Sequence, residues 1–234
     1  MDNTTIADRT ILIAGATSAS GVATARALSD AGARVLVVGS NQQRLEERLD
    51  FATARYQADL GDETEVQSLA KQVHDEHGRI DALIHLVGGW RGGKGIVGQS
   101  SQDYDFLHRS VMTTLRNTTR AFYQDLVDSP AGRLAIISSQ AVATPTPSNA
   151  NYGSVKAAAE FWVQAIARAF AKQAPQAAAV IWVVKALTEQ RPEAPGSKLA
   201  GFTHVDAVAQ AALGLLGTSA GQLNGRRLDL PAID

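Results

Sequence analysis

The chain has 234 residues, no cysteine, and 22 Lys and Arg against 23 Asp and Glu, for a formal net charge of −1. This balance excludes the basic field that recruits nucleic acid or anionic membrane, and the lack of cysteine excludes disulfides, thiol nucleophiles and cysteine zinc sites. The polar start at residues 1–9 and the lack of an apolar run of ~18 residues predict a cytoplasmic protein without a signal peptide or membrane helix.

Strand-like and helix-like segments alternate along the whole chain. Apolar runs predict strands at Thr10–Ala14, Arg34–Val38, Ala54–Gln57, Ala82–Leu86, Gly132–Ser138, Ala178–Val184 and Arg226–Asp229. Helical patterns occupy residues 21–31, 41–50, 62–77, 103–127, 150–172 and 204–216. The alternation predicts an α/β fold of one domain, residues 1–234, with a doubly wound, parallel, seven-stranded sheet. Mobile loops are expected at 88–101 and 187–201, after strand ends, where ligands bind.

Small residues follow the first strand and open the first helix. A pyrophosphate can approach a turn only where side chains are tiny, and a helix N-terminus offers it unpaired N–H groups. The turn therefore predicts a phosphate cradle formed by Gly15, Thr17, Ser18, Ala19, Ser20 and Gly21.

Tyr152 and Lys156 are four residues apart on a predicted helix, which places both on one face. An ammonium ~4 Å from a phenol, at an effective dielectric of ~20, favours the phenolate by about 4 kcal/mol. We therefore expect Lys156 to lower the tyrosine pKa toward neutrality, so that Tyr152 works as a general acid or base. Ser139 ends a strand thirteen residues upstream of Tyr152.

Together these motifs resemble the short-chain dehydrogenase/reductase family. Gly15 and Gly21 are similar to the outer glycines of its T-G-x-x-x-G-x-G turn, and residues 81–88 resemble its D-x-L-V-N-N-A-G segment. The resemblance implies a Rossmann-type fold, and hydride transfer between a nicotinamide and a small-molecule carbonyl or alcohol substrate. It assigns catalysis to Ser139, Tyr152 and Lys156, with the last two also holding the cofactor. Further cofactor contacts are implied at Asp59, Leu60, Val87 and Gly88.

The end of the second strand bears on the choice of cofactor. An acid there binds a ribose 2′-hydroxyl and repels a 2′-phosphate, but this chain reads Val38-Gly39-Ser40-Asn41, with Arg44 one turn further. We therefore expect Ser40, Asn41 and Arg44 to face the adenosine ribose, and we favour NADP over NAD.

Several positions depart from the family pattern. Val111 stands where a catalytic asparagine is expected, His85-Leu86-Val87 replaces N-N-A, and Lys185-Ala186-Leu187 replaces a P-G turn. A non-catalytic dinucleotide-binding sensor or scaffold is therefore a competing hypothesis. A pteridine-type reductase is another, because residues 87–93 resemble the G-G-W-x-G-G loop of dihydropteridine reductases, in which Trp90 would stack on a flat heterocycle.

Other side chains bear on the substrate loops, metals and partners. Trp90 and Leu187 stand in the two expected substrate loops. No metal site is expected, since His74 and His77 read as a solvated helix face, and His85 reads as a hydrogen-bonded strand-end histidine. Adjacent Phe161 and Trp162 exceed what one buried helix stripe requires, and the resemblance implies a homodimer or homotetramer formed through these helices.

Overall fold

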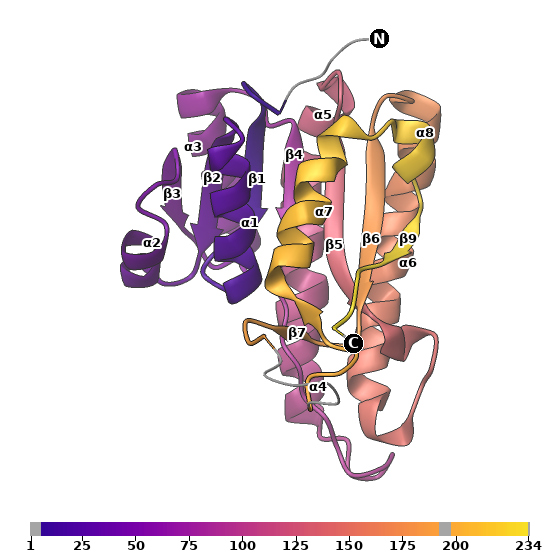
Figure 1. Ribbon diagram of the computed structural model, residues 1–234. Helices are drawn as coiled ribbons and strands as arrows, with labels where there is room; N and C mark the ends of the chain where they lie inside the picture. The colour runs from indigo at the N-terminus through magenta and orange to yellow at the C-terminus, as the bar shows by residue number, and fades with distance from the viewer. Residues whose placement is uncertain (1–5, 192–197, 234) are drawn as a thin grey trace.

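The computed structural model describes residues 6–191 and 198–233, in which strands and helices alternate as expected (Figure 1). Seven parallel strands form one sheet in the order β3-β2-β1-β4-β5-β6-β9. The strands are β1 (Thr10–Ala14), β2 (Arg34–Gly39), β3 (Ala54–Gln57), β4 (Ala82–His85), β5 (Arg133–Ser139), β6 (Ala178–Val184) and β9 (Arg227–Asp229). The chain runs outward from β1 to β3 in one direction and from β4 to β9 in the other. This reversal opens a crevice at the carboxyl ends of β1 and β4.

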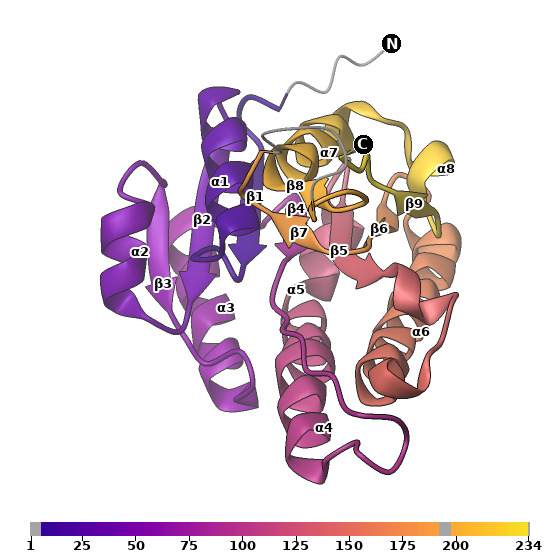
Figure 2. The same cartoon turned by 60° about the horizontal axis from the view of Figure 1, so that its bottom comes forward.

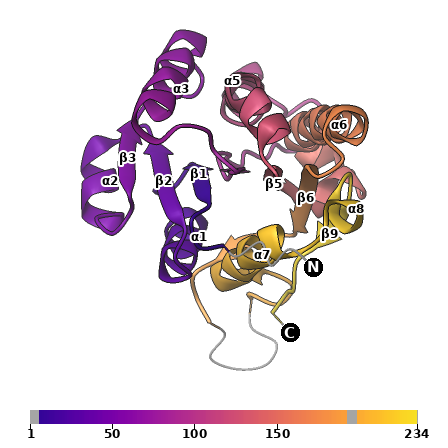
Figure 3. The same cartoon turned by 90° about the horizontal axis from the view of Figure 1, so that it is seen from above.

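Helices cover both faces of the sheet (Figure 3). They are α1 (Ala19–Asp30), α2 (Gln42–Arg48), α3 (Glu63–His77), α4 (Ser101–Leu107), α5 (Thr114–Asp128), α6 (Ala150–Gln173), α7 (Val205–Gly217) and α8 (Ala220–Leu223). Helices α3, α5 and α6 pack on one face, and α1 and α7 on the other. The predicted doubly wound α/β fold is confirmed.

The sheet separates two apolar clusters, and the five inner strands, β2, β1, β4, β5 and β6, contribute to both. On β1, Leu12 faces the cluster under α3, α5 and α6, whereas Ile11 and Ile13 face the cluster under α1 and α7. All three side chains are almost completely buried. A strand covered on both faces needs a continuous apolar run, which is why residues 10–14 carry no polar alternation.

The helix expected at 103–127 is interrupted. It begins earlier, at Ser101, where the Ser100 hydroxyl caps the Asp103 N–H, and a π-helical segment at His108–Thr113 separates α4 from α5. A π-helical turn inserts an extra residue into the repeat, which apolar periodicity does not register. Val111 lies inside this segment and is buried.

Described residues in both segments expected to be mobile loops form hydrogen bonds with the rest of the fold. Gln99 donates its side-chain N–H to the carbonyls of Pro147 and Ser148, each at 3.1 Å, so the 88–101 loop is fastened to the segment before α6. In the other segment Leu187–Thr188 (β7) pairs with Thr203–His204 (β8). Residues 192–197 of that expected loop lie outside the described residues.

The histidines of α3 make contacts that a solvated helix face does not require, although His74 is exposed. The His74 ring lies 2.9 Å from Asp125 on α5, and the His77 ring packs edge-on to Tyr56 with centroids 6.4 Å apart. These contacts join α3 to its neighbours, and periodicity alone does not reveal them.

Among the described helices, none combines the length and apolar character that a membrane crossing requires.

Candidate active site

A groove runs along the carboxyl ends of the strands, the edge that comes forward in Figure 2. It consists of two adjoining cavities of about 720 Å³ and 520 Å³. Both are lined by Ser18, Leu86, Val87 and Gly88, which follow β1 and β4. We call the larger one the catalytic cavity, because the residues predicted to be catalytic line it, and the smaller one the adenosine cavity, because residues expected to face the adenosine ribose line it. The groove therefore spans the crevice that the sheet reversal creates.

Most of the residues selected from the sequence line this groove. The catalytic cavity is lined by Ser18, Ser20, Val87, Gly88, Trp90, Ser139, Tyr152, Lys156 and Leu187. The adenosine cavity is lined by Gly15, Thr17, Ser18, Ser40, Arg44, Asp59, Leu60, Val87 and Gly88. Ala19, Gly21 and Asn41 line neither. Asn41 instead accepts the Arg44 N–H at 2.8 Å and so caps α2.

The turn between β1 and α1 is shaped by close backbone approaches. Gly15 adopts a φ of +78°, and a Cβ there would lie 2.8 Å from the Val87 backbone nitrogen at the end of β4. At Gly21 a Cβ would lie 2.5 Å from the Ala16 carbonyl oxygen. The packing of α1 against its own turn therefore requires a glycine at Gly21, whatever the turn binds.

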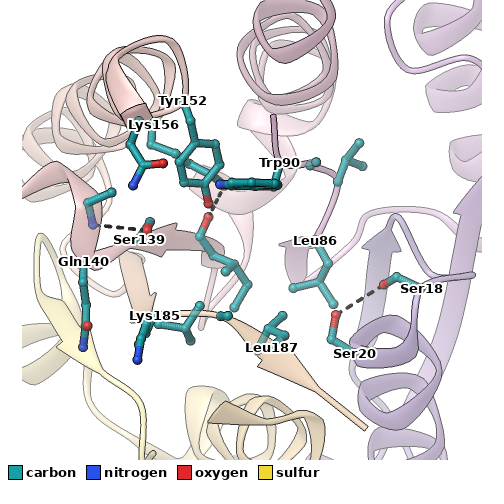
Figure 4. A pocket seen from close by; sticks show the side chains of 18 of the residues that line it. Ser18, Ser20, Leu86, Trp90, Ser139, Gln140, Tyr152, Lys156, Lys185 and Leu187 are labelled. Atoms are coloured by element: carbon teal, nitrogen blue, oxygen red, sulfur yellow. Dashed lines mark hydrogen bonds between the residues drawn. The ribbon is translucent and has the colours of Figure 1, made fainter. Parts of the chain in front are cut away.

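The turn presents polar groups along the groove. Ser18 caps α1 by accepting the Gly21 N–H at 3.1 Å, and its hydroxyl lies 3.3 Å from that of Ser20 (Figure 4). The first N–H groups of a helix lack partners within it, so the start of α1 offers donors to an anion. Small residues at the start of a helix, with free N–H donors, are groups that fit a dinucleotide pyrophosphate.

The adenosine cavity carries more positive than negative charge. Ser40 and Arg44 line it at the end of β2, with no acid at Gly39. Asp59 also lines it, but its carboxylate is 2.7 Å from the guanidinium of Arg109. Burial alone would raise the pKa of Asp59, but hydrogen bonds from the Gly61 N–H and from Arg109 outweigh it and lower the pKa. Arg109 itself was not foreseen, because the π-helical segment sets its direction.

One wall of the catalytic cavity combines Ser139, Tyr152 and Lys156 (Figure 4). Ser139 ends β5, and its hydroxyl accepts the Ala141 N–H at 3.2 Å. Tyr152 and Lys156 come from the first two turns of α6, with the Lys156 amino nitrogen 5.9 Å from the centroid of the tyrosine ring. Ser18 and Ser20 lie across the cavity from this wall. The spacing of four residues therefore does bring the two α6 side chains to one place.

The expected lowering of the Tyr152 pKa is wrong for this structure. Burial raises the pKa of the phenol, and a hydrogen bond with Ser139 opposes that rise only in part. Desolvation disfavours the phenolate, and the Lys156 ammonium is engaged elsewhere, donating to the Ile137 carbonyl at 2.8 Å. The simple two-charge estimate left out the burial of both groups.

An ion pair between Glu160 and Arg227 lies behind the buried Lys156. Burial lowers its pKa to about 8, while the Glu160 carboxylate one turn further along α6 opposes the shift. Glu160 accepts a hydrogen bond from the Ser138 hydroxyl at 2.5 Å and from Arg227 Nε at 3.2 Å. Arg227, on β9, also donates to the Ser139 carbonyl at 3.0 Å. The pair thus joins the edge strand β9 to β5 and α6, directly behind Ser139 and Lys156.

His85 is the buried strand-end histidine that the sequence predicts. Its ring nitrogens lie 3.2 Å from the Thr114 hydroxyl and 3.1 Å from that of Thr118. Burial, with a contribution from the charge of Lys156, lowers the pKa of His85 to about 3. The ring is therefore neutral at physiological pH, and it links β4 to α5 beside the groove.

Sequence reasoning missed several residues of the site. Gln140 and Lys185 line the catalytic cavity; Phe106, Arg109, Ser110 and Thr114 line the adenosine cavity. Lys185 follows a strand predicted to end at 184, so its place at the carboxyl edge could have been inferred. The residues of 106–114 carried no such signal, since they enter the site through the interrupted helix.

Comparison with known proteins identifies the family of this chain. The sequence model of the short chain dehydrogenase family matches residues 9–188. The chain belongs to the short chain dehydrogenase family, a family of oxidoreductases.

Two kinds of relative illustrate the match. The 2,3-dihydro-2,3-dihydroxybenzoate dehydrogenase of Bacillus subtilis (strain 168) is 28% identical over 160 residues, which are 66% of this chain and 61% of that protein. Among solved structures, a gluconate 5-dehydrogenase from Burkholderia cenocepacia in complex with NADP and tartrate superposes with a TM-score of 0.82 at 22% identity, covering 97% of this chain and 95% of the other. An NAD+-bound xylitol dehydrogenase also gives 0.82, at 19% identity and coverages of 96% and 98%. Structures similar to this chain in fold thus include complexes with either dinucleotide.

Proposed function

We propose that this protein is a nicotinamide-dependent oxidoreductase that interconverts a small carbonyl compound and the corresponding alcohol. The observation that carries the proposal is the wall of Ser139, Tyr152 and Lys156, which faces the cradle of Ser18 and Ser20 across one cavity. The bound dinucleotide would supply or accept the hydride. The cradle would hold its pyrophosphate, and Lys156 its nicotinamide ribose.

The proton steps fall to residues of the wall. Hydride addition to a carbonyl carbon puts negative charge on its oxygen, and Tyr152 would donate a proton there. The Ser139 hydroxyl would donate a hydrogen bond that strengthens as this charge develops. The raised pKa of Tyr152 favours the protonated phenol at neutral pH, which suits the reductive direction. In oxidation the phenolate is needed, so oxidative activity should rise with pH.

The charge of the adenosine cavity supports NADP over NAD. Arg44 and Arg109 contribute two guanidinium groups near Ser40, against the single carboxylate of Asp59, which Arg109 neutralises. A 2′-phosphate would gain charge-assisted hydrogen bonds there, whereas a 2′-hydroxyl lacks its usual acid.

The choice of dinucleotide can be reversed by one substitution. NADPH should bind at least tenfold more tightly than NADH, and Gly39→Asp should invert this order. A Cβ at Gly39 would lie 3.2 Å from Thr17 Cγ2, a contact that a small side-chain shift relieves. Gly39→Asn has nearly the same shape without the charge, and should leave NADPH preferred. Tighter NADH binding by the unmodified protein, measured by calorimetry, would contradict the NADP preference.

A substrate panel tests the activity itself. Ketones, oxo acids, quinones and pterins are offered with NADPH and with NADH, and loss of absorbance of the reduced cofactor is followed. Turnover of a ketone or oxo acid supports the proposal. Turnover confined to pterins would indicate the pteridine-type reductase, which the exposure of Trp90 at the cavity allows. Tight NADPH binding with no turnover would indicate a sensor or scaffold.

We further propose that α6 contributes to a homodimer or homotetramer interface. Phe161 on this helix is 78% exposed, although the adjacent Trp162 is half-buried and bonded to Thr119 at 2.9 Å. An exposed aromatic ring on the outer face of α6 favours contact with a second copy. Light scattering should report a dimer or tetramer, and Phe161→Glu should shift it toward the monomer.

A further inference from the structure

The charged side chains that line the catalytic cavity are all positive among the described residues. Among the described residues that line it, Lys156 and Lys185 are cations, and none is Asp or Glu. Lys156 is already committed, since it is buried and donates to the Ile137 carbonyl. Lys185 is exposed to the cavity, and no step of the proposed reaction uses it.

The sheet places Lys185 close to the reacting centre. Val184, the last residue of β6, pairs with Ser139, so Lys185 follows one strand away from Gln140. Neighbouring parallel strands lie about 4.8 Å apart. Figure 4 shows the side chains of Lys185 and Gln140 on the same rim of the cavity, below Ser139. An anion at this rim would be within reach of both side chains while a carbonyl group occupied the space before Tyr152.

The ammonium of Lys185 retains donors for a ligand. Its Nζ donates to the Ala200 carbonyl at 3.3 Å and lies 5.6 Å from the centroid of the Phe202 ring. Those contacts orient the side chain and use one of its three N–H groups. Within residues 6–191 and 198–233, no carboxylate forms an ion pair with it.

A purely structural role explains Lys185 less well. The segment it contacts is held by other bonds: the Thr203 N–H donates to the Ala186 carbonyl at 2.8 Å, and the Gly201 N–H to the Ile233 carbonyl at 2.8 Å. The Lys185 ammonium is thus not needed to hold this segment, and its charge stands at the rim of the catalytic cavity.

We propose that the substrate is an oxo acid or hydroxy acid, whose carboxylate binds Lys185 and the Gln140 amide while its carbonyl or alcohol group faces Ser139 and Tyr152. This inference rests on the proposed oxidoreductase function. The substrate's carboxylate would accept a charge-assisted hydrogen bond from one partly solvated ammonium, so we expect an effect of roughly fivefold to thirtyfold on the KM of a carboxylate substrate.

Matched substrates and variants test the inference. Oxo acids and their methyl esters are compared as substrates of the unmodified protein, Lys185→Met, Lys185→Arg and the surface control Lys172→Met. Lys185→Met should raise KM for the acids only, with kcat for the esters and dinucleotide affinity unchanged. Lys185→Arg should retain most of the preference for acids, and Lys172→Met all of it. Equal losses on acids and esters, or an unmodified protein that prefers esters, would overturn the proposal.

A binding measurement keeps the proposal separable from the function on which it rests. Calorimetry of succinate and of dimethyl succinate is performed on the NADP-bound protein and on its Lys185→Met variant. Binding of succinate that Lys185→Met weakens fivefold or more supports the anion site even if no substrate is turned over, which would count against the oxidoreductase proposal alone. Succinate binding that is absent, or unaffected by Lys185→Met, overturns the anion site even if neutral ketones are reduced.

Discussion

The two sides of the groove differ in side-chain size and in the burial of polar groups. The cradle side consists of small residues whose backbones approach closely, as at Gly15 and Gly21, and most of its polar groups stay near solvent. The catalytic wall consists of polar side chains taken out of water: Ser139 and Lys156 are buried, and Tyr152 is half-buried. Space therefore limits substitutions on the cradle side, whereas the cost of desolvating charge limits them at the wall.

This contrast explains why one expected property failed. The cradle is predicted from small residues, and a lack of side chains is a property of the sequence alone. The pKa of Tyr152 was not predictable from its distance to one lysine, because burial and the Ile137 carbonyl also act on the pair. The pKa of an ionisable group in a protein interior depends on all the groups packed around it.

The largest expected effect tests the wall. Tyr152→Phe removes one hydroxyl and should lower kcat by ~10² or more while leaving dinucleotide affinity nearly intact. Lys156→Met should reduce both quantities, since the lysine would serve the ribose as well as the proton transfer. Steady-state rates and calorimetry on the same preparations separate the two outcomes. Full activity of Tyr152→Phe would remove the mechanism.

The next effect tests the cradle. Gly21→Ala places a Cβ against the Ala16 backbone, so the turn must shift. We expect a loss of stability of about 1–3 kcal/mol and a fall in dinucleotide affinity of tenfold or more. Gly214→Ala on α7 is the matched control, because a Cβ there meets nothing within 4 Å. It should stabilise α7 slightly and leave affinity unchanged. A Gly21→Ala protein with native affinity would show that the turn is not limited by space.

A smaller effect concerns the buried histidine. The pKa of His85 is lowered to about 3, so between its ordinary value and that pH the unfolded chain binds the extra proton and stability falls as the pH drops. Asparagine does not titrate, so the free energy of unfolding of His85→Asn should fall between pH 7 and pH 4.5 by about 2 kcal/mol less than that of the unmodified protein. Urea unfolding at both pH values measures the difference. His108→Asn, at an exposed histidine, is the control and should show the unmodified pH dependence.

The smallest expected effect concerns the influence of Glu160 on the pKa of Lys156. Glu160 opposes the lowering of the Lys156 pKa, so Glu160→Gln should lower that pKa below about 8. If the reaction needs the ammonium, the alkaline limb of the pH–rate profile should move down by roughly half a pH unit. Glutamine keeps hydrogen-bond acceptors for Ser138 and Arg227, and Glu47→Gln on exposed α2 is the control. An unmoved alkaline limb would leave Glu160 with a packing role only.

Much of the architecture was predictable from local patterns. The seven strands of the main sheet were expected within a residue or so at each end, because buried parallel strands are continuous apolar runs. The interrupted helix at 101–128 and the short β7–β8 pair were not. Both depend on what the segment packs against, and their residues show no distinct period.

By itself the sequence determined three local properties. These are the apolar runs that form the buried strands, the small-residue turn after β1, and the spacing that brings Tyr152 and Lys156 together. The tertiary structure decided which charges meet. Arg109 reaches Asp59 from 50 residues away, and Arg227 reaches the Ser139 carbonyl from 88 residues away. Lys185 reaches the rim beside Gln140 because parallel pairing sets β6 against β5. Long-range pairing brings these groups together, and their electrostatic energies depend on burial that only the folded chain creates.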